Sequence, residues 1–321
     1  MLRRRLLLAT PAVLAAPSAL HAQGAWPNRP VRIINPYAPG GTSDIVMRYL
    51  AAGIERAVGP PLIGGDRPSG GRDGRTAAEA DAAPEGLTPR VKDIGPLAVS
   101  VSMTPPPAYN PERSFAYITM FGGAPILCAV KGDGPIRSMA DYKAAAAVRR
   151  EAVSFGSSGV GSVGHLAGML WAQEAGVELL HVPFRGAADA EQAIMGGNTT
   201  SLWNTVGAHT GGVQGNSIRG LAVTSEQRVT SVPNVPSIVE AGFPGSVASN
   251  WFLLAGPAGL SGEIVGRLRA HLAAAMAEPA ARERWAAIGM VSLGDPTPAE
   301  IAGFVAREAA RWAPVVRASG A

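Results

Sequence analysis

The chain has 321 residues, more than one typical domain, so we expect two domains. Hydrophobic residues make up 47% of it and charged residues 16%, a balance that excludes a disordered chain. The formal net charge is only +4, and no basic block is interleaved with aromatic residues, which argues against a nucleic-acid partner.

The N-terminus has the order of an export signal. Three arginines at residues 3–5 precede an apolar stretch at residues 6–16, and Ala22 offers a small residue for cleavage. The stretch is shorter than the about 20 residues that cross a bilayer, which argues against a membrane anchor. We therefore predict that residues 1–22 are a signal peptide of the general or the twin-arginine route. Its removal takes the formal net charge from +4 to +1, and the mature protein is expected in the periplasm.

Short β-rich runs alternate with alanine-rich helical runs, a pattern that predicts α/β domains with largely parallel sheets. In chain order we expect strands at 31–37, 115–119, 126–130, 153–156, 178–183, 219–224 and 251–255, and helices at 43–58, 139–149, 163–176, 188–196, 264–276, 280–288 and 298–319. The single cysteine, Cys128, lies in an apolar run and is typical of a small core residue.

The loop at 36–44 joins the first predicted strand to the first predicted helix and is rich in glycine. Gly40 and Gly41 let a ligand approach the backbone, and the N–H groups of a helix start carry partial positive charge. The pattern fits an anion site without lysine. It fits equally a tight turn in which Ser43 or Asp44 caps the helix.

A second loop of the same design runs from Ser157 to Ser162, between the strand at 153–156 and the helix that begins near residue 163. Two such loops suit a ligand with two carboxylates, one held by each lobe. We expect the backbone amides of Gly40, Gly41 and Thr42 to hold one carboxylate. The amides of residues 158–162 would face the other end.

The second loop also permits two enzymatic interpretations. The G-x-G-x-x-G spacing at 159–164 resembles a dinucleotide site, but no acidic residue ends the next strand. An exported serine hydrolase would use Ser158 or Ser162 with His165 as the base, although the G-x-S-x-G elbow is missing. A histidine in this position more often packs in the core or bonds to the backbone.

Residues 181–186 end the next predicted strand at a turn. Arg185 stands there, where its guanidinium either forks onto a carboxylate or lies on the surface. The histidines, His181 and His209 among them, show no metal-binding spacing. We expect neither a metal nor a cofactor.

Several short motifs follow one another in a fixed order along the mature chain. They lie at 26–32, 36–44, 66–68, 157–162, 165–168, 181–186, 221–225, 235–242, at Trp251 and in the C-terminal helices that end with Trp312. Together they resemble the substrate-binding proteins of tripartite tricarboxylate transporters, the Bug-type receptors. The resemblance spans nearly the whole mature chain.

The resemblance implies an α/β protein with the class II periplasmic-binding-protein fold, in which two crossover segments join two lobes. We expect lobe 1 at 23–124 and 250–321, and lobe 2 at 125–249. It implies a monomeric receptor that performs no chemistry and delivers a di- or tricarboxylate, or an aromatic acid, to membrane permease subunits. The expected ligand-binding residues are Tyr37, Pro39, Gly40, Gly41, Thr42, Asp44, Ser157, Ser158, Gly159, Gly161, Ser162, His165, Phe184, Arg185 and Asn204.

Two segments depart from the family's pattern. Thr200 and Asn204 stand where relatives usually carry two acids, and losing a carboxylate near the cleft makes amino-acid ligands less favoured. Residues 87–92, with Pro89 and alternating charges, replace an apolar strand. Such a strand is expected at a sheet edge.

Overall fold

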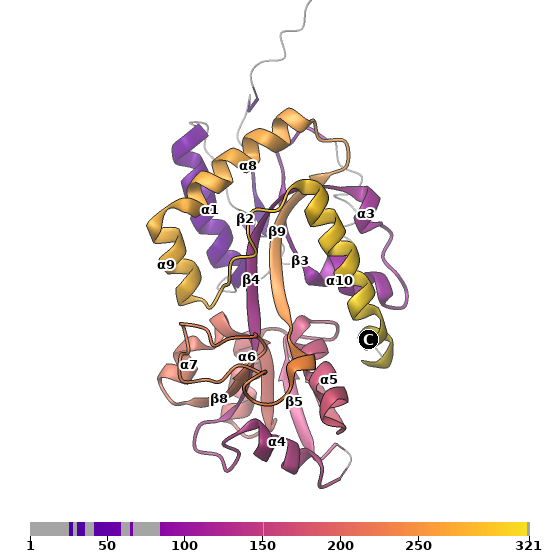
Figure 1. The fold of residues 1–321 in the computed structure, drawn as a ribbon, viewed down its shortest axis with the longest axis vertical. Helices are drawn as coiled ribbons and strands as arrows, with labels where there is room; N and C mark the ends of the chain where they lie inside the picture. Colours follow the sequence, from indigo (N-terminus) through magenta and orange to yellow (C-terminus); the bar gives the residue numbers. More distant parts are fainter. Residues whose placement is uncertain are drawn as a thin grey trace, which may run out of the picture.

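The computed structural model describes residues 26–27, 31–35, 42–58, 65–66, 84–149 and 151–319, which form two α/β lobes stacked along the long axis (Figure 1). The first lobe contains β1 (Ile34–Asn35), α1 (Thr42–Val58), β2 (Gly65–Asp66), β3 (Arg90–Asp93), the π-helical turn η1 (Gly95–Val99), the 3-10 turn η2 (Ser100–Ser102), α3 (Pro111–Ser114), α8 (Gly262–Ala277), α9 (Pro279–Ala287) and α10 (Pro298–Ser319). The second lobe contains α4 (Met139–Ala146), β5 (Val153–Ser157), α5 (Val163–Ala175), β6 (Leu179–Pro183), α6 (Ala187–Met195), β7 (Ser201–Thr205), η3 (Val206–Ala208), α7 (Thr210–Gln214), β8 (Ile218–Val223) and η4 (Pro244–Ser246).

Two long strands, β4 (Phe115–Lys131) and β9 (Ser249–Pro257), connect the lobes. The predicted strands at 115–119 and 126–130 are parts of one strand, because β4 continues without a break for 17 residues. Residues 115–125 pair with β9, and residues 126–131 pair with β7 and β8. Gly122, with φ of 128°, lies at a register shift on β4. Such a bulge lets the strand bend where it leaves the first lobe.

Strand β3 lies inside the first-lobe sheet, between β1 and β9, so the expectation that residues 87–92 belong at a sheet edge was wrong. Pro89 directly precedes β3 and needs no N–H in the ladder, while its carbonyl accepts a hydrogen bond from Ile34 N. The ammonium of Lys92 lies 4.2 Å from the centroid of the Phe115 ring, which accommodates the buried charge.

The helices predicted from the 139–149 run onward are confirmed, with ends shifted by a few residues. Three of them begin at a serine whose hydroxyl accepts a hydrogen bond from the backbone N–H three residues later: Ser138, Ser162 and Ser261. Gly176 ends α5 in the left-handed conformation that glycine favours. Of the strand predicted at 31–37, the structure shows only Ile34–Asn35, and residues 36–37 lie outside the described residues.

Tryptophan side chains form the centre of a core that both lobes share. Trp171 and Trp203 lie in the second lobe with ring centroids 5.8 Å apart. Trp251 on β9 and Trp312 on α10 are each 1% exposed. All four belong to one cluster of buried apolar side chains, together with Cys128 on β4. The core is therefore continuous from lobe to lobe along β4, α5 and α10.

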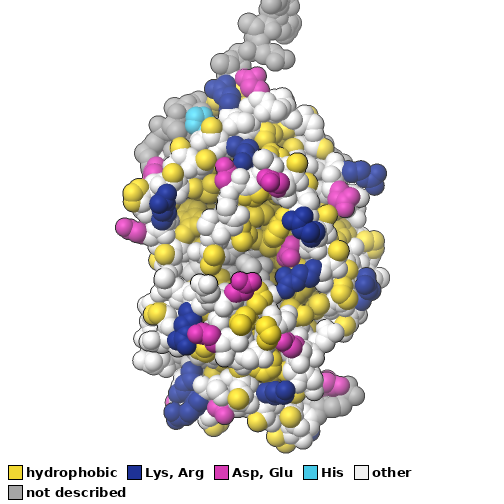
Figure 2. Space-filling model, viewed as in Figure 1, with side chains coloured by type: hydrophobic (Ala, Val, Ile, Leu, Met, Phe, Trp, Pro, Cys, Tyr) yellow, Lys and Arg dark blue, Asp and Glu magenta, His cyan; other side chains and the backbone are white. Residues whose placement is uncertain are grey.

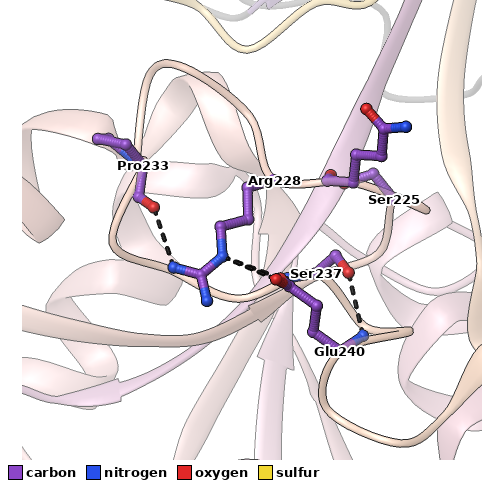
Figure 3. A network of polar contacts seen from close by, with 6 residues as sticks. Ser225, Arg228, Pro233, Ser237 and Glu240 are labelled. Carbon is purple, nitrogen blue, oxygen red and sulfur yellow. Dashed lines mark hydrogen bonds and ion pairs between the residues drawn. The ribbon is translucent and has the colours of Figure 1, made fainter.

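A polar network fixes the segment that follows β8 (Figure 3). Ser237 N donates to Glu240 Oε2 at 2.7 Å, and Glu240 N donates to Ser237 Oγ at 3.1 Å, which is the reciprocal pattern of a capping box. Arg228 Nε lies 2.9 Å from the same carboxylate, and the Arg228 guanidinium also reaches Pro233 O at 3.2 Å. The Ser237 N–H, and after it Arg228, lower the pKa of Glu240. These bonds order the segment that carries the 235–242 motif.

Acidic and basic side chains are interspersed on the face of both lobes that Figure 2 shows. The attraction of an anion to this protein therefore depends on local groups at its site rather than on a field of one sign across that face. Among the described residues, no helix combines the length and the apolar composition that a membrane span requires.

Candidate functional site

Strand direction places the carboxyl end of β1 and the second predicted loop on opposite sides of one inter-lobe boundary. In the first lobe β4 runs toward the second lobe, β9 is antiparallel to it and β3 is antiparallel to β9. Hence β3 and its parallel neighbour β1 also run toward the second lobe. In the second lobe β7 is antiparallel to β4, so β7 and its parallel neighbours β5 and β6 run toward the first lobe. The carboxyl ends of β1 and of β5–β7 face each other, which is where α/β sheets bind ligands.

Most of the first predicted loop, including Tyr37, Pro39, Gly40 and Gly41, lies outside the described residues. At the start of α1, Thr42 and Asp44 are 6% and 5% exposed. Asp44 Oδ1 lies 2.8 Å from Arg48 Nε one turn later, so its charge is paired within α1. Thr42 Oγ1 is buried and has no hydrogen-bond partner among the described residues. The start of α1 thus offers a ligand one buried hydroxyl beside an acid that is already paired.

The second loop, residues 158–162, connects β5 to α5 through two glycines in the left-handed region. Gly159 and Gly161 have φ of 117° and 69°, values that other residues rarely adopt. Ser162 Oγ accepts a hydrogen bond from His165 N at 3.2 Å and so caps α5. The positive end of the α5 dipole is thereby directed at the inter-lobe boundary.

Three of the five backbone N–H groups in this loop donate to acceptors in the protein, contrary to the expectation that residues 158–162 all face the ligand. Gly159 N donates to Ser157 Oγ at 3.3 Å. Gly161 N donates to His165 Nδ1 at 3.2 Å, and Ser162 N donates to Gly159 O at 3.1 Å. These bonds set the shape of the loop. Side chains must therefore supply a larger share of the donors to a ligand.

A buried serine and a histidine support the loop from the sheet. Ser157 is fully buried, and its Oγ lies 2.8 Å from His181 Nε2 on β6 and accepts a hydrogen bond from Ser162 Oγ at 3.1 Å. Ser157 also donates to Gly159 O at 3.1 Å. A hydroxyl has one proton and two lone pairs, so these contacts share it, and the imidazole tautomer decides which of Ser157 and His181 donates to the other. The pair therefore positions the loop.

The imidazole ring of His165 is not hydrogen-bonded to either serine considered as a nucleophile. Its Nδ1 accepts the N–H of Gly161. The hydroxyl of Ser162 donates to Ser157, and the hydroxyl of Ser158 donates to Asn204 Oδ1 at 3.3 Å. A serine nucleophile must give its proton to the base. The arrangement therefore does not assemble the serine and base of a hydrolase.

The two imidazole rings under the loop stack on each other, with centroids of His165 and His181 3.8 Å apart and planes inclined by 17°. Burial, and after it the neighbouring His165, lowers the pKa of His181 from 6.5 to about 3. The folded protein thus holds His181 neutral over a pH range in which the unfolded chain protonates it.

Acidification from pH 6.5 toward pH 3 should lower the free energy of unfolding through His181. Between these values the unfolded chain binds more protons than the folded one, so stability is complete above the unfolded pKa and is lost as the pH falls. Urea midpoints at about pH 7 and about pH 4.5, measured for the wild type and His181→Gln, check this. The variant keeps a side-chain amide that can donate to Ser157 or accept from it, and it should lose less stability. Equal losses would exclude a contribution from His181.

The carboxyl end of β7 lies beside the loop at 158–162, because the start of α5 packs very closely against β7. A Cβ added to Gly164 would lie 2.1 Å from the carbonyl oxygen of Trp203, so only glycine permits this approach. The next residue of β7, Asn204, is 5% exposed. Its Oδ1 accepts hydrogen bonds from Thr205 N at 3.0 Å and from Ser158 Oγ at 3.3 Å. Asn204 is thus connected to the loop by a side-chain bond.

The structure separates the two departures that the sequence placed near the cleft. Thr200 precedes the amino end of β7, where Ser154 N donates to its Oγ1 at 3.4 Å and Thr200 N donates to Ser154 Oγ at 3.1 Å. Asn204 lies at the carboxyl end, against the loop. Only Asn204 belongs to the candidate site.

Phe184 and Arg185 follow β6 at the same edge of the sheet. Phe184 N donates to Ser157 O at 2.9 Å, and the Phe184 ring lies so close to Gly156 that an added Cβ there would be 2.9 Å from Cε2. The side chain of Arg185 is exposed. Phe184 therefore packs against the strand that carries the loop, whereas Arg185 extends into solvent.

Similarity to known proteins identifies the family. The sequence pattern of the tripartite tricarboxylate transporter family receptor matches residues 46–321. Over 317 residues the chain is 30% identical to Protein BugT of Bordetella pertussis, which covers 98% of this chain and 96% of BugT. The chain belongs to the tripartite tricarboxylate transporter receptor family. A Pseudomonas protein encoded in a tcbD–tcbE intergenic region is also 30% identical, over 312 residues that cover 96% of this chain and 92% of that protein.

Solved structures show the fold of this receptor. A periplasmic transporter, 26% identical, superposes with a TM-score of 0.84 and covers 91% of this chain and 98% of its own. MatC from Rhodopseudomonas palustris, solved with bound malate, is 26% identical with a TM-score of 0.82. The match covers 91% of this chain and 100% of MatC. Another R. palustris protein, solved with adipate, is 28% identical with a TM-score of 0.85. The match covers 92% of this chain and 98% of that protein. The expected two-lobed periplasmic-binding-protein fold is confirmed.

In this tripartite tricarboxylate receptor, sequence reasoning missed one residue that shapes the site, His181. The motif at 181–186 indicates the end of a strand and a turn, and nothing in the local sequence indicates a role for its histidine. The parallel register of β5 and β6, in which Phe155 pairs with His181, brings the ring under the loop. Within the described part of the chain, no group of three His, Cys, Asp or Glu side chains is arranged to hold a metal ion.

Proposed function

We propose that this receptor is exported to the periplasm, captures a small carboxylate between its lobes and delivers it unchanged to the membrane permease subunits of a tripartite tricarboxylate transporter. The observation that carries the proposal is the opposition of the carboxyl ends of β1 and β5 across one boundary, with the start of α5 directed into it. The ligand is a di- or tricarboxylate or an aromatic acid. The malate and adipate bound by the two R. palustris proteins support a carboxylate.

The lobes are proposed as residues 23–124 with 250–321, and residues 125–249, after removal of a signal peptide at 1–22. The change of partners along β4 supports the division, since Pro125 pairs with β9 and Ile126 with β7. We propose that the receptor acts as a monomer and that the ligand favours closure of the lobes by binding the closed state more tightly.

Carboxylates should stabilise the receptor, whereas uncharged amide analogues of the same shape should not. A ligand at 100 times its dissociation constant adds about 2.7 kcal/mol of stability. Each kcal/mol raises the melting temperature of a protein of this size by roughly 2–4 °C. Thermal melts with succinate, adipate, malate, citrate and benzoate, each beside its amide, make the measurement. Native mass spectrometry of the purified protein identifies any ligand that it carries. A panel without any shift would contradict the proposal.

A further inference from the structure

The side-chain amide of Asn204 carries a buried donor that no described residue satisfies. Asn204 is 5% exposed, and its Nδ2 is shielded from solvent without a hydrogen-bond partner in the part of the chain that the structure describes. Native proteins rarely leave a buried N–H group unsatisfied, so a donor that the described residues do not satisfy is suited to an acceptor on a ligand.

The orientation of this amide is fixed by its neighbour. Thr205 N lies 3.0 Å from the side-chain oxygen of Asn204, and a backbone N–H can only donate. Turning the amide over would set two donors against each other. Ser158 Oγ adds a second hydrogen bond to the same oxygen. The atom left without a partner is therefore the NH₂ group and not the carbonyl oxygen.

The position of Asn204 makes a ligand the natural acceptor. It lies at the carboxyl end of β7, next to a loop whose amides at Gly159, Gly161 and Ser162 are already donated within the protein. The close approach of α5 at Gly164 holds this end of β7 in place. A rigid, unsatisfied donor of this kind favours ligands that place a hydrogen-bond acceptor against it. A ligand that places a donor there leaves both donors unpaired.

We propose that Asn204 determines the ligand class of this receptor by donating Nδ2 to an oxygen atom that can only accept, a keto or carboxylate oxygen. The same group disfavours amino acids, whose ammonium presents only donors. The inference rests on the proposed function. It narrows the ligand to carboxylates without an amino group.

Calorimetric titration of the full-length mature chain tests the proposal with keto and amino acids of matched skeleton. The probes are 2-oxoglutarate with glutamate, pyruvate with alanine, and phenylpyruvate with phenylalanine, together with succinate and adipate. The protein is compared as wild type, Asn204→Asp and Thr200→Asp. Asn204→Asp keeps an oxygen for Thr205 N and Ser158, and replaces the donor by an acceptor. Thr200→Asp adds the same charge at the opposite end of β7 and is the matched control.

The wild type should bind the keto member of a pair at least roughly tenfold more tightly than the amino member, because an ammonium group at Nδ2 would leave two donors unpaired. Asn204→Asp should weaken binding of keto acids and simple dicarboxylates by roughly tenfold or more and shift the preference toward the amino acid. Thr200→Asp should keep the wild-type preference. Circular dichroism and melting temperatures of the ligand-free variants check that they fold. The preference of the wild type for the keto member of each pair tests the proposal even if a variant does not fold.

Two results would overturn the inference while leaving the proposed function intact. One is a wild type that binds an amino acid as tightly as its keto partner. The other is an Asn204→Asp variant that binds carboxylates like Thr200→Asp. If no carboxylate of either panel binds the wild type, the proposed function itself fails, and the inference fails with it.

Discussion

Replacing Gly164 by alanine should destabilise the receptor by roughly 3 kcal/mol or more, at the upper end of the range for overpacking. The added Cβ would lie 2.1 Å from Trp203 O and 2.9 Å from Trp203 C. These are backbone atoms of a buried strand, so they cannot rotate away as the end of a flexible side chain would. The first turn of α5 must move off β7 instead. Urea unfolding of the variant measures the loss.

The same substitution should also weaken ligand binding, because it separates the start of α5 from Asn204. The matched control is Gly266→Ala in α8, where no heavy atom lies within 4 Å of the added Cβ. At this exposed helical position alanine should stabilise the protein by about 0.5–1 kcal/mol. If Gly164→Ala unfolded at the wild-type urea concentration, α5 would be able to slide on β7 without loss. The close approach would then have no role in placing the loop.

The second loop was predictable because its determinants are local. The glycines at 159 and 161, the capping serine at 162 and the apolar run after it are all signals that a single strand–loop–helix unit carries in its own sequence. The α/β pattern followed from the alternation of strands and helices in the same way. Parallel pairing then places the loops at the carboxyl ends of their strands, which makes the general position of the site an expected result.

The contacts inside the site were not predictable, because they depend on register between segments far apart in the chain. His181 reaches Ser157 only through the pairing of β5 with β6. The hydrogen bond from Gly161 N to His165 depends on the side-chain conformation of the histidine, which the sequence does not reveal. Local propensity also misjudged β3, since the position of Lys92 is decided by its tertiary contact with Phe115.

A second large effect is expected at Glu308 in α10, whose carboxylate serves two buried indoles. Trp251 Nε1 donates to Glu308 Oε2 at 3.1 Å, and Trp312 Nε1 donates to the same atom at 3.2 Å. Glu308→Leu removes the shared acceptor and leaves two N–H groups in the core. Each unsatisfied donor costs about 1–3 kcal/mol, so the variant should lose roughly 2–6 kcal/mol in urea unfolding.

Glu308→Gln is the matched control, because its amide oxygen can still accept from the indoles, and it should lose less than about 1 kcal/mol. The loss in Glu308→Leu should also reach the ligand. Trp251 follows the crossover on β9, and Trp312 belongs to the helix that packs on α5 of the second lobe. Weaker packing of Trp251 and Trp312 weakens the contact between the lobes. The rise in melting temperature produced by a carboxylate should therefore decrease as well. Equal urea midpoints for the two variants would show that water or another group satisfies the indoles, and that the carboxylate is not what holds α10 against both lobes.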